Sequence, residues 1–378
     1  MKEKLIIKNF GPIKDVELEL GRFNVLIGDQ GTGKSTVSKL YTLICNYAYY
    51  DIFNDAEIEN SHDSNTLKFF RNLELFGIIN YLDKDTEIKL DSSRFQFEFA
   101  EGVVKTKHPE LYKMSPSEMP ERMKIHFSFD YIPAERAFVS ILADALFGLI
   151  ELGTKLPTLF NRFGNKFSSA RKEKTKRNYK ELLGADFSHI NGVDTVIIKN
   201  GKILPLSAAS TGMQGTMPML VVFDTIVEKI TRNENNNPNA LLVIEEPELN
   251  LFPKTQKKIL EYIVSNNLEN GNFKTQIIIN THSPYILTSL NNLMYAYEVG
   301  KKESDKVNQV IKKKYWINPE DVSAYRLMPN GSAKKIISKT EGGNLIEAEE
   351  IDEISTKINF EFDELLRIDL GLKNKANV

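Results

Sequence analysis

The chain has 378 residues and a formal net charge of −2, and 41% of its residues are hydrophobic and 26% charged. This composition is typical of globular proteins and excludes the disordered and fibrous classes. Because the net charge is close to zero, binding to nucleic acid would need a local basic patch. The single cysteine, Cys45, excludes a disulfide framework and a cysteine zinc site, and it predicts a small buried side chain in a reducing compartment.

Length and apolar patterning predict one large domain without a membrane segment. The N-terminal sequence MKEKLIIKNF has too short an apolar run for a signal peptide. The most apolar stretch, residues 137–159, is interrupted by Asp144, Glu151 and Lys155, whereas a membrane span needs about 18 uninterrupted apolar residues. We therefore expect a cytoplasmic protein that does not bind membranes.

The first 50 residues predict three strands and a helix. Apolar residues 5–7 and the alternating pattern of residues 16–20 indicate two strands joined at Gly11-Pro12. Residues 23–27 predict a third strand, and residues 37–50 have apolar side chains at helical spacing. The order is therefore strand, glycine-rich loop and helix.

The middle of the chain is less regular. Residues 51–130 hold short strand-like pieces such as TEIKL and FQFEF, which predict a β-rich subregion. Residues 137–183 predict helical structure and end in the basic run SSARKEKTKRNYKELL. Residues 194–207 predict a hairpin that turns at Asn200-Gly201, because this pair readily adopts positive φ angles.

The last third of the chain predicts a helix over residues 217–231 and buried strands over residues 241–244 and 276–280. A further hairpin is expected at Asn330-Gly331, and a charged helix near the C-terminus.

The sequence GDQGTGKST matches the phosphate-binding pattern G-x-x-x-x-G-K-[ST] and lies between a predicted strand and helix, as this motif requires. In such a loop, backbone N–H groups surround the phosphates, Lys34 reaches the β- and γ-phosphates, and the Ser35 hydroxyl ligates Mg²⁺. The predicted nucleotide-binding residues of the loop are Gly28, Asp29, Gln30, Gly31, Thr32, Gly33, Lys34, Ser35 and Thr36. A phosphate loop alone leaves kinases, GTPases and several ATPase classes open.

Two adjacent acids end the predicted strand 241–244, where a sheet can bring them beside the phosphate loop. One carboxylate can hold Mg²⁺, directly or through water, while the other accepts a proton from an attacking water. Because side chains alternate along a strand, Glu245 and Glu246 suit different tasks. The alternative is a solvated strand end.

His282 ends the second apolar strand, in the sequence QIIINTHSPYIL. A histidine at this place can hydrogen-bond the γ-phosphate, whereas the simpler alternative is a capping or core-edge histidine. The neighbouring motifs favour the phosphate role.

Together these motifs resemble the ABC-type ATPase heads of the RecF, SMC and OLD proteins, and more closely the compact AAA-family ATPases of bacterial anti-phage defence systems. The resemblance rests on IKNFGPIKDVELEL before GDQGTGKST, then YIPAER, SAASTGMQG, VIEEPELNLFP and NTHSPYIL, in family order. It implies an α/β P-loop NTPase fold with a central mixed sheet and an N-terminal antiparallel β subregion. The implied organisation is one ATPase domain over residues 1–378, with a helical insertion at residues 137–190 and a C-terminal α+β extension at residues 300–378.

The resemblance also implies roles for individual residues. Residues 28–36 correspond to Walker A, and Glu245 corresponds to the Mg²⁺-associated acid of Walker B, which is usually Asp. Glu246 corresponds to the general base, with His282 and Lys34 as further catalytic residues. Residues 248–251 correspond to the segment that links two active sites. ATP and Mg²⁺ are the implied cofactors.

The segment SAASTGMQG resembles the ABC signature, with Thr211 in place of the usual first glycine. In this family the signature contacts the γ-phosphate bound to the opposite subunit, which implies an ATP-dependent homodimer with two composite sites. Ser210, Gly212 and Gln214 are the implied nucleotide ligands, and donors at a helix start suit an anion. A simple helix cap at Ser210 or Thr211 is the alternative.

Two further segments have open interpretations. No glutamine clearly matches the Q-loop of the family, and Glu135 or Arg136 in YIPAER is the candidate for that neighbourhood, with a structural salt bridge as the alternative. The second segment is the basic run between Arg171 and Lys180, which is either a contact for DNA or RNA phosphates or a solvated helix face. Its basic residues are Arg171, Lys172, Lys174, Lys176, Arg177 and Lys180.

Two features of larger relatives are missing. Only residues 137–190 are available where SMC heads carry long coiled coils, and no Asp-x-Asp pair of a Toprim nuclease follows Tyr315. We therefore expect a sensor or scaffold ATPase in DNA-linked or anti-phage defence, with a nuclease or toxin effector on a separate chain and residues 137–159 as a candidate docking surface. The alternatives are the nucleotide-binding subunit of an ABC transporter and a solitary P-loop kinase or NTPase.

Overall fold

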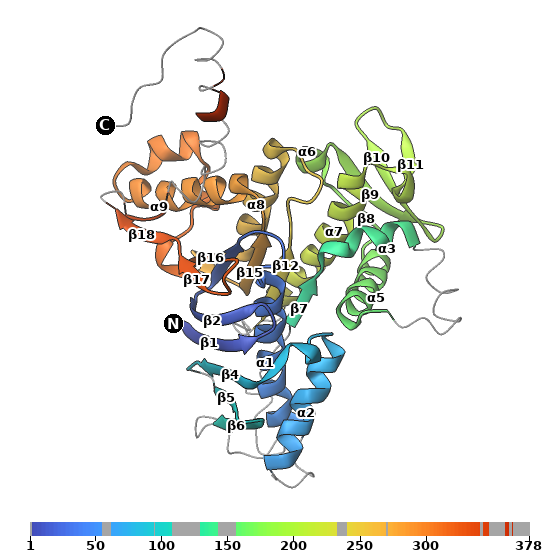
Figure 1. Ribbon diagram of the computed structural model, residues 1–378. Helices are drawn as coiled ribbons and strands as arrows, with labels where there is room; N and C mark the ends of the chain where they lie inside the picture. Colours follow the sequence, from blue (N-terminus) through green and yellow to red (C-terminus); the bar gives the residue numbers. More distant parts are fainter. Residues whose placement is uncertain are drawn as a thin grey trace.

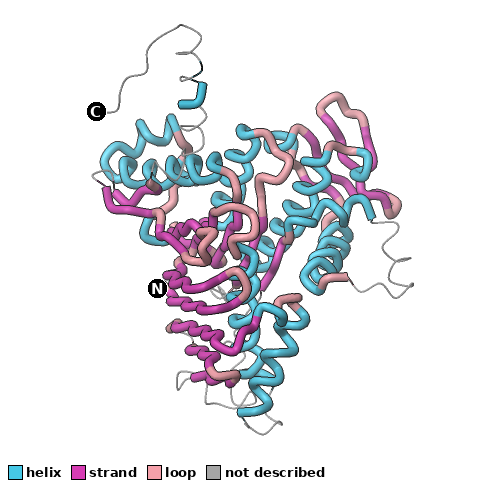
Figure 2. The backbone as a smooth tube through the Cα atoms, in the orientation of Figure 1, coloured by secondary structure: helices cyan, strands magenta, loops and turns pink. Residues whose placement is uncertain are grey.

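The computed structural model describes residues 2–54, 62–93, 95–107, 129–142, 156–232, 240–269, 271–340 and 343–347, with four further positions at 360–362 and 365. Three larger sheets organise this part of the chain, and two further sheets have two strands each (Figure 1). Figure 2 shows the strands of the central and N-terminal sheets stacked on one another, with helices above them and to their right.

The central sheet has six strands in the order β17-β16-β3-β15-β12-β7. Five of them are parallel, and β17 joins the edge as an antiparallel strand. The carboxyl ends of the parallel strands therefore share one edge, which is where such sheets bind ligands. The strands are β3 (Phe23–Ile27), β7 (Phe129–Ile132), β12 (Leu241–Glu245), β15 (Gln276–Thr281), β16 (Val322–Leu327) and β17 (Ala333–Lys335). This topology confirms the predicted mixed sheet.

The central sheet separates two hydrophobic cores. Leu242 and Ile244 of β12 pack in the core that contains α7 (Thr211–Arg232), α8 (Pro253–Asn267) and α9 (Pro284–Val310). Leu241 and Val243, on the opposite face, pack in the core that contains α1 (Lys34–Asn54). Because helices cover both faces, β12 and β15 are buried throughout, which explains their continuous apolar sequences.

The N-terminal sheet is antiparallel and has the order β2-β1-β4-β5-β6. Its strands are β1 (Glu3–Phe10), β2 (Ile13–Leu20), β4 (Leu82–Asp91), β5 (Gln96–Ala100) and β6 (Val103–Lys107). This sheet confirms the two predicted N-terminal strands and the β-rich subregion within the described residues. Residues 108–128 of that subregion lie outside them.

The helix α2 (His62–Leu75) was not predicted. Its sequence HDSNTLKFFRNLEL is mostly polar, so few apolar residues carry the helical spacing. Phe69 and Leu73, four residues apart, are buried, and the Phe69 ring centroid lies 5.3 Å from that of Phe97 and 5.1 Å from that of Phe99. Packing against the N-terminal sheet therefore stabilises α2, which a local sequence pattern does not reveal.

The third sheet, at the right of Figure 1, has the order β11-β10-β9-β8. The prediction of helix up to residue 183 is wrong for residues 174–179, because Lys176 and Arg177 pair with β9 and the Arg177 side chain is buried against α7, whereas residues 180–183 are helical as predicted. The segment 137–190, predicted as a helical insertion, therefore also contains strands. Gly201 has a φ of 80° in the hairpin of β10 and β11, as predicted. The elements are α3 (Ala137–Leu142), α5 (Thr158–Glu173), β8 (Lys176–Arg177), α6 (Lys180–Leu183), β9 (Ala185–Ile190), β10 (Val193–Ile198) and β11 (Ile203–Pro205).

The hairpin of β16 and β17 confirms the predicted turn at Asn330-Gly331. Gly331 has a φ of 82°, and a Cβ at this position would lie 2.7 Å from the backbone of Pro12 and Lys14, so only glycine fits. β16 pairs with β3, so part of the segment predicted as an extension completes the central sheet. The division of the chain into a domain, an insertion and an extension stays a prediction, and most of the expected C-terminal helix lies outside the described residues.

The remaining elements are short. They are β13 (Leu268–Glu269), β14 (Asn272–Phe273), β18 (Ile337–Thr340), β19 (Gly343–Ile346) and the 3₁₀ turns η1 (Ile79–Tyr81), η4 (Ala134–Arg136), η5 (Leu206–Ala208), η6 (Lys313–Tyr315) and η7 (Pro319–Asp321).

Candidate nucleotide site

The phosphate loop connects β3 to α1 at the carboxyl edge of the central sheet. The helix begins at Lys34, three residues before the predicted start, so the loop leads directly into its N-terminus. Gly28 has a φ of 153°, and a Cβ there would lie 2.4 Å from the carbonyl oxygen of Leu327 in β16. Gly33 has a φ of 97°, a conformation that other residues rarely adopt. The loop geometry therefore requires glycine at these two positions of the motif.

Lys34 lies at the centre of this loop and is 6% exposed. Its Nζ donates to the carbonyl oxygens of Gly28 and Asp29 at 2.7 and 2.8 Å, and the Thr32 hydroxyl also donates to Asp29 at 2.8 Å. Burial lowers the pKa of Lys34, while the nearby Glu246 and Asp29 carboxylates oppose this change. The ammonium group is thus held at the place where the motif puts the phosphates.

A cleft of about 280 Å³ joins this loop to the two predicted strand ends. It is lined by Pro12, Gln30, Gly31, Gly33, Lys34, Ser35, Thr36, Tyr81, Glu245, Glu246, Asn280 and His282. The structure therefore brings together most of the predicted site, from segments more than 200 residues apart in sequence. Gly28, Asp29 and Thr32 form the loop without lining the cleft.

Glu246 follows the last residue of β12 and has a φ of 44°, which is unusual for a residue with a side chain. Its backbone N–H donates to the carbonyl of Asn280 at 2.8 Å, and its Oε1 lies 3.7 Å from His282 Nε2. Burial raises the pKa of the Glu246 carboxyl, and the His282 ring opposes that rise. A carboxylate with a raised pKa in a cleft is a suitable general base.

Glu245 is 5% exposed and is held by the end of β7. One carboxylate oxygen accepts a hydrogen bond from the Tyr131 hydroxyl at 2.7 Å, and the other accepts one from the Ala134 N–H at 3.3 Å. The carboxylate also lines the cleft that contains Ser35. Because Tyr131 and Ala134 already donate to the Glu245 carboxylate, fewer of its lone pairs are available to a cation. This favours a contact with the cation through water over direct ligation.

Glu248 orients the residues around His282. Its Oε1 accepts hydrogen bonds from the Thr281 hydroxyl at 2.6 Å and from the His282 N–H at 2.8 Å. Residues 248–251, in which Asn250 has a φ of 57°, are therefore connected to His282 within one chain.

Asn280 and Tyr81 line the cleft, although the sequence did not identify them. Asn280 Oδ1 accepts a hydrogen bond from Ser38 at 2.8 Å, and its buried Nδ2 has no partner among the described residues. A polar residue inside the apolar run QIIINT is the signal that could have revealed Asn280. Tyr81 arrives from η1 and packs edge-to-face on Phe10, with ring centroids 5.9 Å apart. No local signal marks it.

The predicted signature residues lie outside this cleft. Ser210 is exposed directly before α7, and its Oγ accepts a long hydrogen bond from Met213 N–H at 3.4 Å. The Gln214 amide, 8% exposed, donates to the carbonyls of Ser207 and Ala209 at 2.7 and 3.0 Å, so it is used within its own chain. Of the implied ligands here, Ser210 is the one with an exposed side chain.

Gly212 packs against the segment after Walker B. A Cβ on Gly212 would lie 2.7 Å from the carbonyl oxygen of Asn250 and 3.2 Å from Leu251 Cδ2. The start of α7 and residues 250–251 therefore form one continuous surface, beside which Phe252 is 77% exposed.

Within the described part of the chain Arg136 forms no ion pair, so it does not provide the salt bridge that was the alternative for YIPAER. It is 0% exposed, and its donors point to backbone carbonyls of Pro133, Gly215, Glu245 and Glu246. Burial lowers the pKa of the guanidinium to about 10, so it remains charged at neutral pH.

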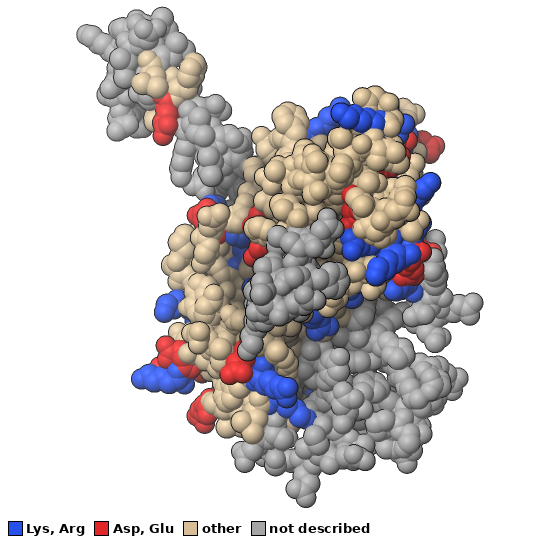
Figure 3. All heavy atoms as spheres, turned by 90° about the vertical axis from the view of Figure 1, so that its right-hand side faces the viewer, with Lys and Arg blue, Asp and Glu red and all other residues tan. Residues whose placement is uncertain are grey.

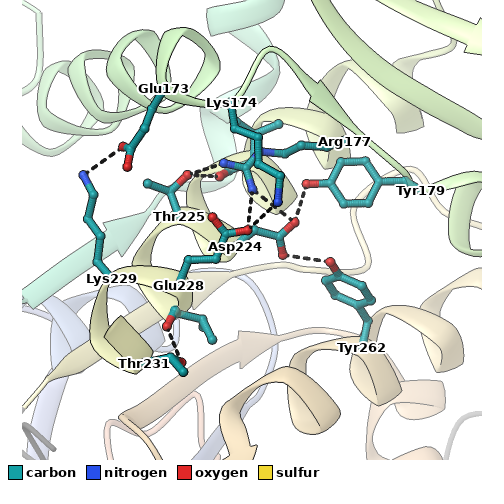
Figure 4. A network of polar contacts seen from close by, with 12 residues as sticks. Glu173, Lys174, Arg177, Tyr179, Asp224, Thr225, Glu228, Lys229, Thr231 and Tyr262 are labelled. Atoms are coloured by element: carbon teal, nitrogen blue, oxygen red, sulfur yellow. Dashed lines mark hydrogen bonds and ion pairs between the residues drawn. The ribbon is translucent and has the colours of Figure 1, made fainter. Parts of the chain in front are cut away.

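Three of the six basic residues in the predicted run form ion pairs within the described part of the chain. Arg171 pairs with Asp194, and Lys174 contacts Glu228 at 2.8 Å. Figure 4 shows Arg177 within a network centred on Asp224, whose carboxylate accepts hydrogen bonds from Tyr179 at 2.7 Å and Tyr262 at 2.8 Å. Figure 3 shows the Lys and Arg residues of this side of the molecule in separate groups, interrupted by acidic and uncharged residues. Arg177, buried on the strand β8, therefore belongs to no solvated helix face, and a nucleic-acid contact of the other basic residues stays a prediction.

The described residues hold neither a cluster of metal ligands nor a membrane-spanning helix. No three His, Cys, Asp or Glu side chains in that part of the chain cluster as metal ligands, and no helix there combines the length and apolarity needed to cross a membrane. Cys45 is buried, as predicted.

A family model described as "AAA ATPase domain" matches residues 1–136 and 149–287. Among solved structures, the chain is similar to the SMC head domain from Thermotoga maritima, at 11% identity and a TM-score of 0.39, over 92% of this chain and 98% of that chain. It is also similar to the recombination mediator protein RecF-ATPrS, at 10% identity and a TM-score of 0.37, over 89% and 98%. A third similar structure is a nucleotide-free ATP-binding cassette from an ABC transporter, at 14% identity and a TM-score of 0.36, over 94% of this chain and 96% of that chain. No curated protein matches the chain.

Proposed function

Because the chain belongs to the AAA ATPase domain family and has the predicted P-loop ATPase fold, we propose that it binds and hydrolyses ATP in the cleft between α1 and the ends of β12 and β15. One observation carries the proposal: Lys34, Glu246 and His282 line the same cleft, with Glu246 Oε1 3.7 Å from His282 Nε2. A phosphate-binding cation and a carboxylate base thus face one space.

In the proposed reaction, the loop N–H groups and Lys34 hold the β- and γ-phosphates. Glu246 accepts the proton of the attacking water, and His282 hydrogen-bonds the γ-phosphate and so senses its presence. The buried Nδ2 of Asn280, which has no hydrogen-bond partner among the described residues, suits a phosphate oxygen or the attacking water.

The same residues fit Mg²⁺, which prefers hard oxygen ligands and keeps several waters. Ser35 would provide a direct ligand, and Glu245 would act through water because Tyr131 and Ala134 already donate to its carboxylate. The ion would neutralise charge on the phosphates during transfer.

We further propose that two copies of the chain assemble head to head on ATP, with the signature of one completing the site of the other. Ser210 is exposed at the start of α7 and lies outside the cleft of its own chain, which leaves its hydroxyl accessible to a second subunit. Gly212 contributes backbone N–H at the same helix N-terminus. Gln214 would support this loop through its contacts with Ser207 and Ala209.

The biological role that we propose is that of a cytoplasmic sensor or scaffold ATPase in DNA-linked or anti-phage defence, acting with a separate nuclease or toxin. The motif set that resembles RecF, SMC and OLD heads supports this role. A transporter subunit and a solitary P-loop enzyme are the competing functions, and dimerisation without membrane association separates the proposal from both.

The decisive experiment compares wild type with Glu246→Gln. We expect wild type to hydrolyse ATP slowly and the variant to lose about a hundredfold or more of its turnover while remaining an ATP-bound dimer. Phosphate release measures turnover, and light scattering with and without ATP measures mass. Normal hydrolysis by Glu246→Gln would show that another residue is the base, and a monomer with full turnover would favour the solitary enzyme.

A further inference from the structure

Arg136 is the largest fully buried side chain of the described residues and is charged. Its Nε donates to the Gly215 carbonyl at 3.1 Å, and its Nη1 donates to the Pro133 carbonyl at 3.0 Å. Nη1 also donates to the carbonyl of Glu245 at 2.6 Å, and Nη2 to that of Glu246 at 2.6 Å. One planar group therefore connects the end of β7, the end of β12 and the second turn of α7.

These acceptors belong to different halves of the proposed ATP site. Glu246 carries the general base and adopts a strained φ of 44°, so its side-chain direction depends on how its backbone is held. Gly215 lies five residues after Ser210, in the helix whose first turn would contact the nucleotide of the other subunit. A second contact supports the same connection, because the Ser140 hydroxyl of α3 donates to the Gln214 carbonyl at 2.7 Å.

A guanidinium suits this task better than other side chains. It presents five N–H donors in a rigid plane, whereas a lysine has one flexible ammonium that cannot reach three separated segments in fixed directions. Its charge is balanced by surrounding acids, since Glu245, Glu246 and Glu248 all raise its pKa against the lowering effect of burial.

We propose that Arg136 is a positioning residue that couples the signature helix α7 to the general base Glu246. Engagement of Ser210 by the second subunit then fixes α7, and through Arg136 it fixes the backbone from which Glu246 projects. Hydrolysis is in this way restricted to the assembled dimer. The inference rests on the proposed ATPase function and adds the link between its two half-sites.

The test uses Arg136→Lys with Arg177→Lys as the matched control. Arg177 is also buried, with its side chain 2% exposed, and it contacts the same helix through Thr225 at 2.6 Å, but it lies at the other end of α7 from the site. We expect Arg136→Lys to lower kcat about tenfold or more while KM and ATP binding stay within about threefold, and Arg177→Lys to leave both near the wild-type values. Phosphate release and the fluorescence of a labelled ATP give these quantities.

A double-mutant cycle with Ser210→Ala tests the coupling itself. If Arg136 transmits engagement of the signature, the double variant should be about as slow as the slower single variant, because both changes break one connection. If the fold-losses in kcat of the two single variants multiply in the double variant, the inference is overturned. A wild-type kcat in Arg136→Lys would also overturn it. Circular dichroism and thermal melting verify that the variants fold. If Arg136→Lys does not fold, Ser140→Ala is the substitute test and should lower kcat severalfold. A wild-type kcat in Ser140→Ala would then overturn the inference.

If the wild-type protein hydrolyses no ATP, the proposed function is wrong. If the wild-type protein is active and Arg136→Lys is equally active, only this inference is wrong.

Discussion

At the residue scale, the two principal groups of the site have pKa values shifted toward each other. Burial raises the pKa of Glu246 above its usual 4.5 and lowers that of Lys34 below its usual 10.5. In the proposed mechanism, turnover needs Glu246 deprotonated and Lys34 charged, so it should fall as pH drops through the raised pKa of Glu246 and as pH rises through the lowered pKa of Lys34. We therefore expect a bell-shaped kcat/KM profile narrower than the interval from 4.5 to 10.5. Lys34→Arg should remove the alkaline limb, and an unchanged limb would assign it to another group.

The residues of this site differ in how visible they are in the sequence. Lys34, Glu246 and His282 stand in motifs whose chemistry depends on adjacent residues, so local reading identifies them. Asn280 and Tyr81 reach the cleft only through the pairing of β15 with β3 and the packing of η1 on Phe10. Such positions depend on tertiary geometry, which a local pattern does not encode.

At the element scale, the contact between the signature and the segment after Walker B depends on Gly212. A methyl group there would meet the Asn250 carbonyl at 2.7 Å, so Gly212→Ala should displace one of the two segments and weaken ATP-dependent dimers about tenfold. Gly215→Ala is the control, because its Cβ would meet only the Ala137 Cβ, at 3.9 Å, and alanine is favoured over glycine in a helix by about 1 kcal/mol. Sedimentation of both variants with ATP measures the effect. If Gly212→Ala dimerises as well as Gly215→Ala, the two segments can move apart without weakening the dimer.

The sequence predicted those helices and strands in which the apolar residues follow one clear pattern. β12 and β15 contain runs of buried apolar residues and α7 is amphipathic, so their type follows from sequence, although α7 begins at Thr211 and not at residue 217. α2 and β8 were missed because tertiary contacts stabilise them: the first packs on Phe97 and Phe99, and the second is fixed by the burial of Arg177.

At the scale of the whole molecule, one large apolar side chain marks the surface beside the signature. Phe252 is 77% exposed at the start of α8, directly after Leu251, which lies close to Gly212. In the proposed dimer it becomes buried, so Phe252→Asp in the Glu246→Gln background should weaken ATP-dependent association about tenfold or more without changing ATP binding. Val310→Asp is the control, because Val310 is 84% exposed at the end of α9. Light scattering compares the variants, and an unchanged dimer would place the interface elsewhere.

The position of β16 has a consequence for how the protein is made. The strand that leads into the phosphate loop, β3, is flanked by β15 and by β16, which lie about 250 and 300 residues further along the chain. Because synthesis proceeds from the N-terminus, the loop glycine Gly28 cannot pack on Leu327 until that residue, about 300 positions later, has left the ribosome. The nascent chain therefore carries the phosphate-loop sequence long before the strand that flanks it exists, and the proposed ATP site forms only after β16 has been made.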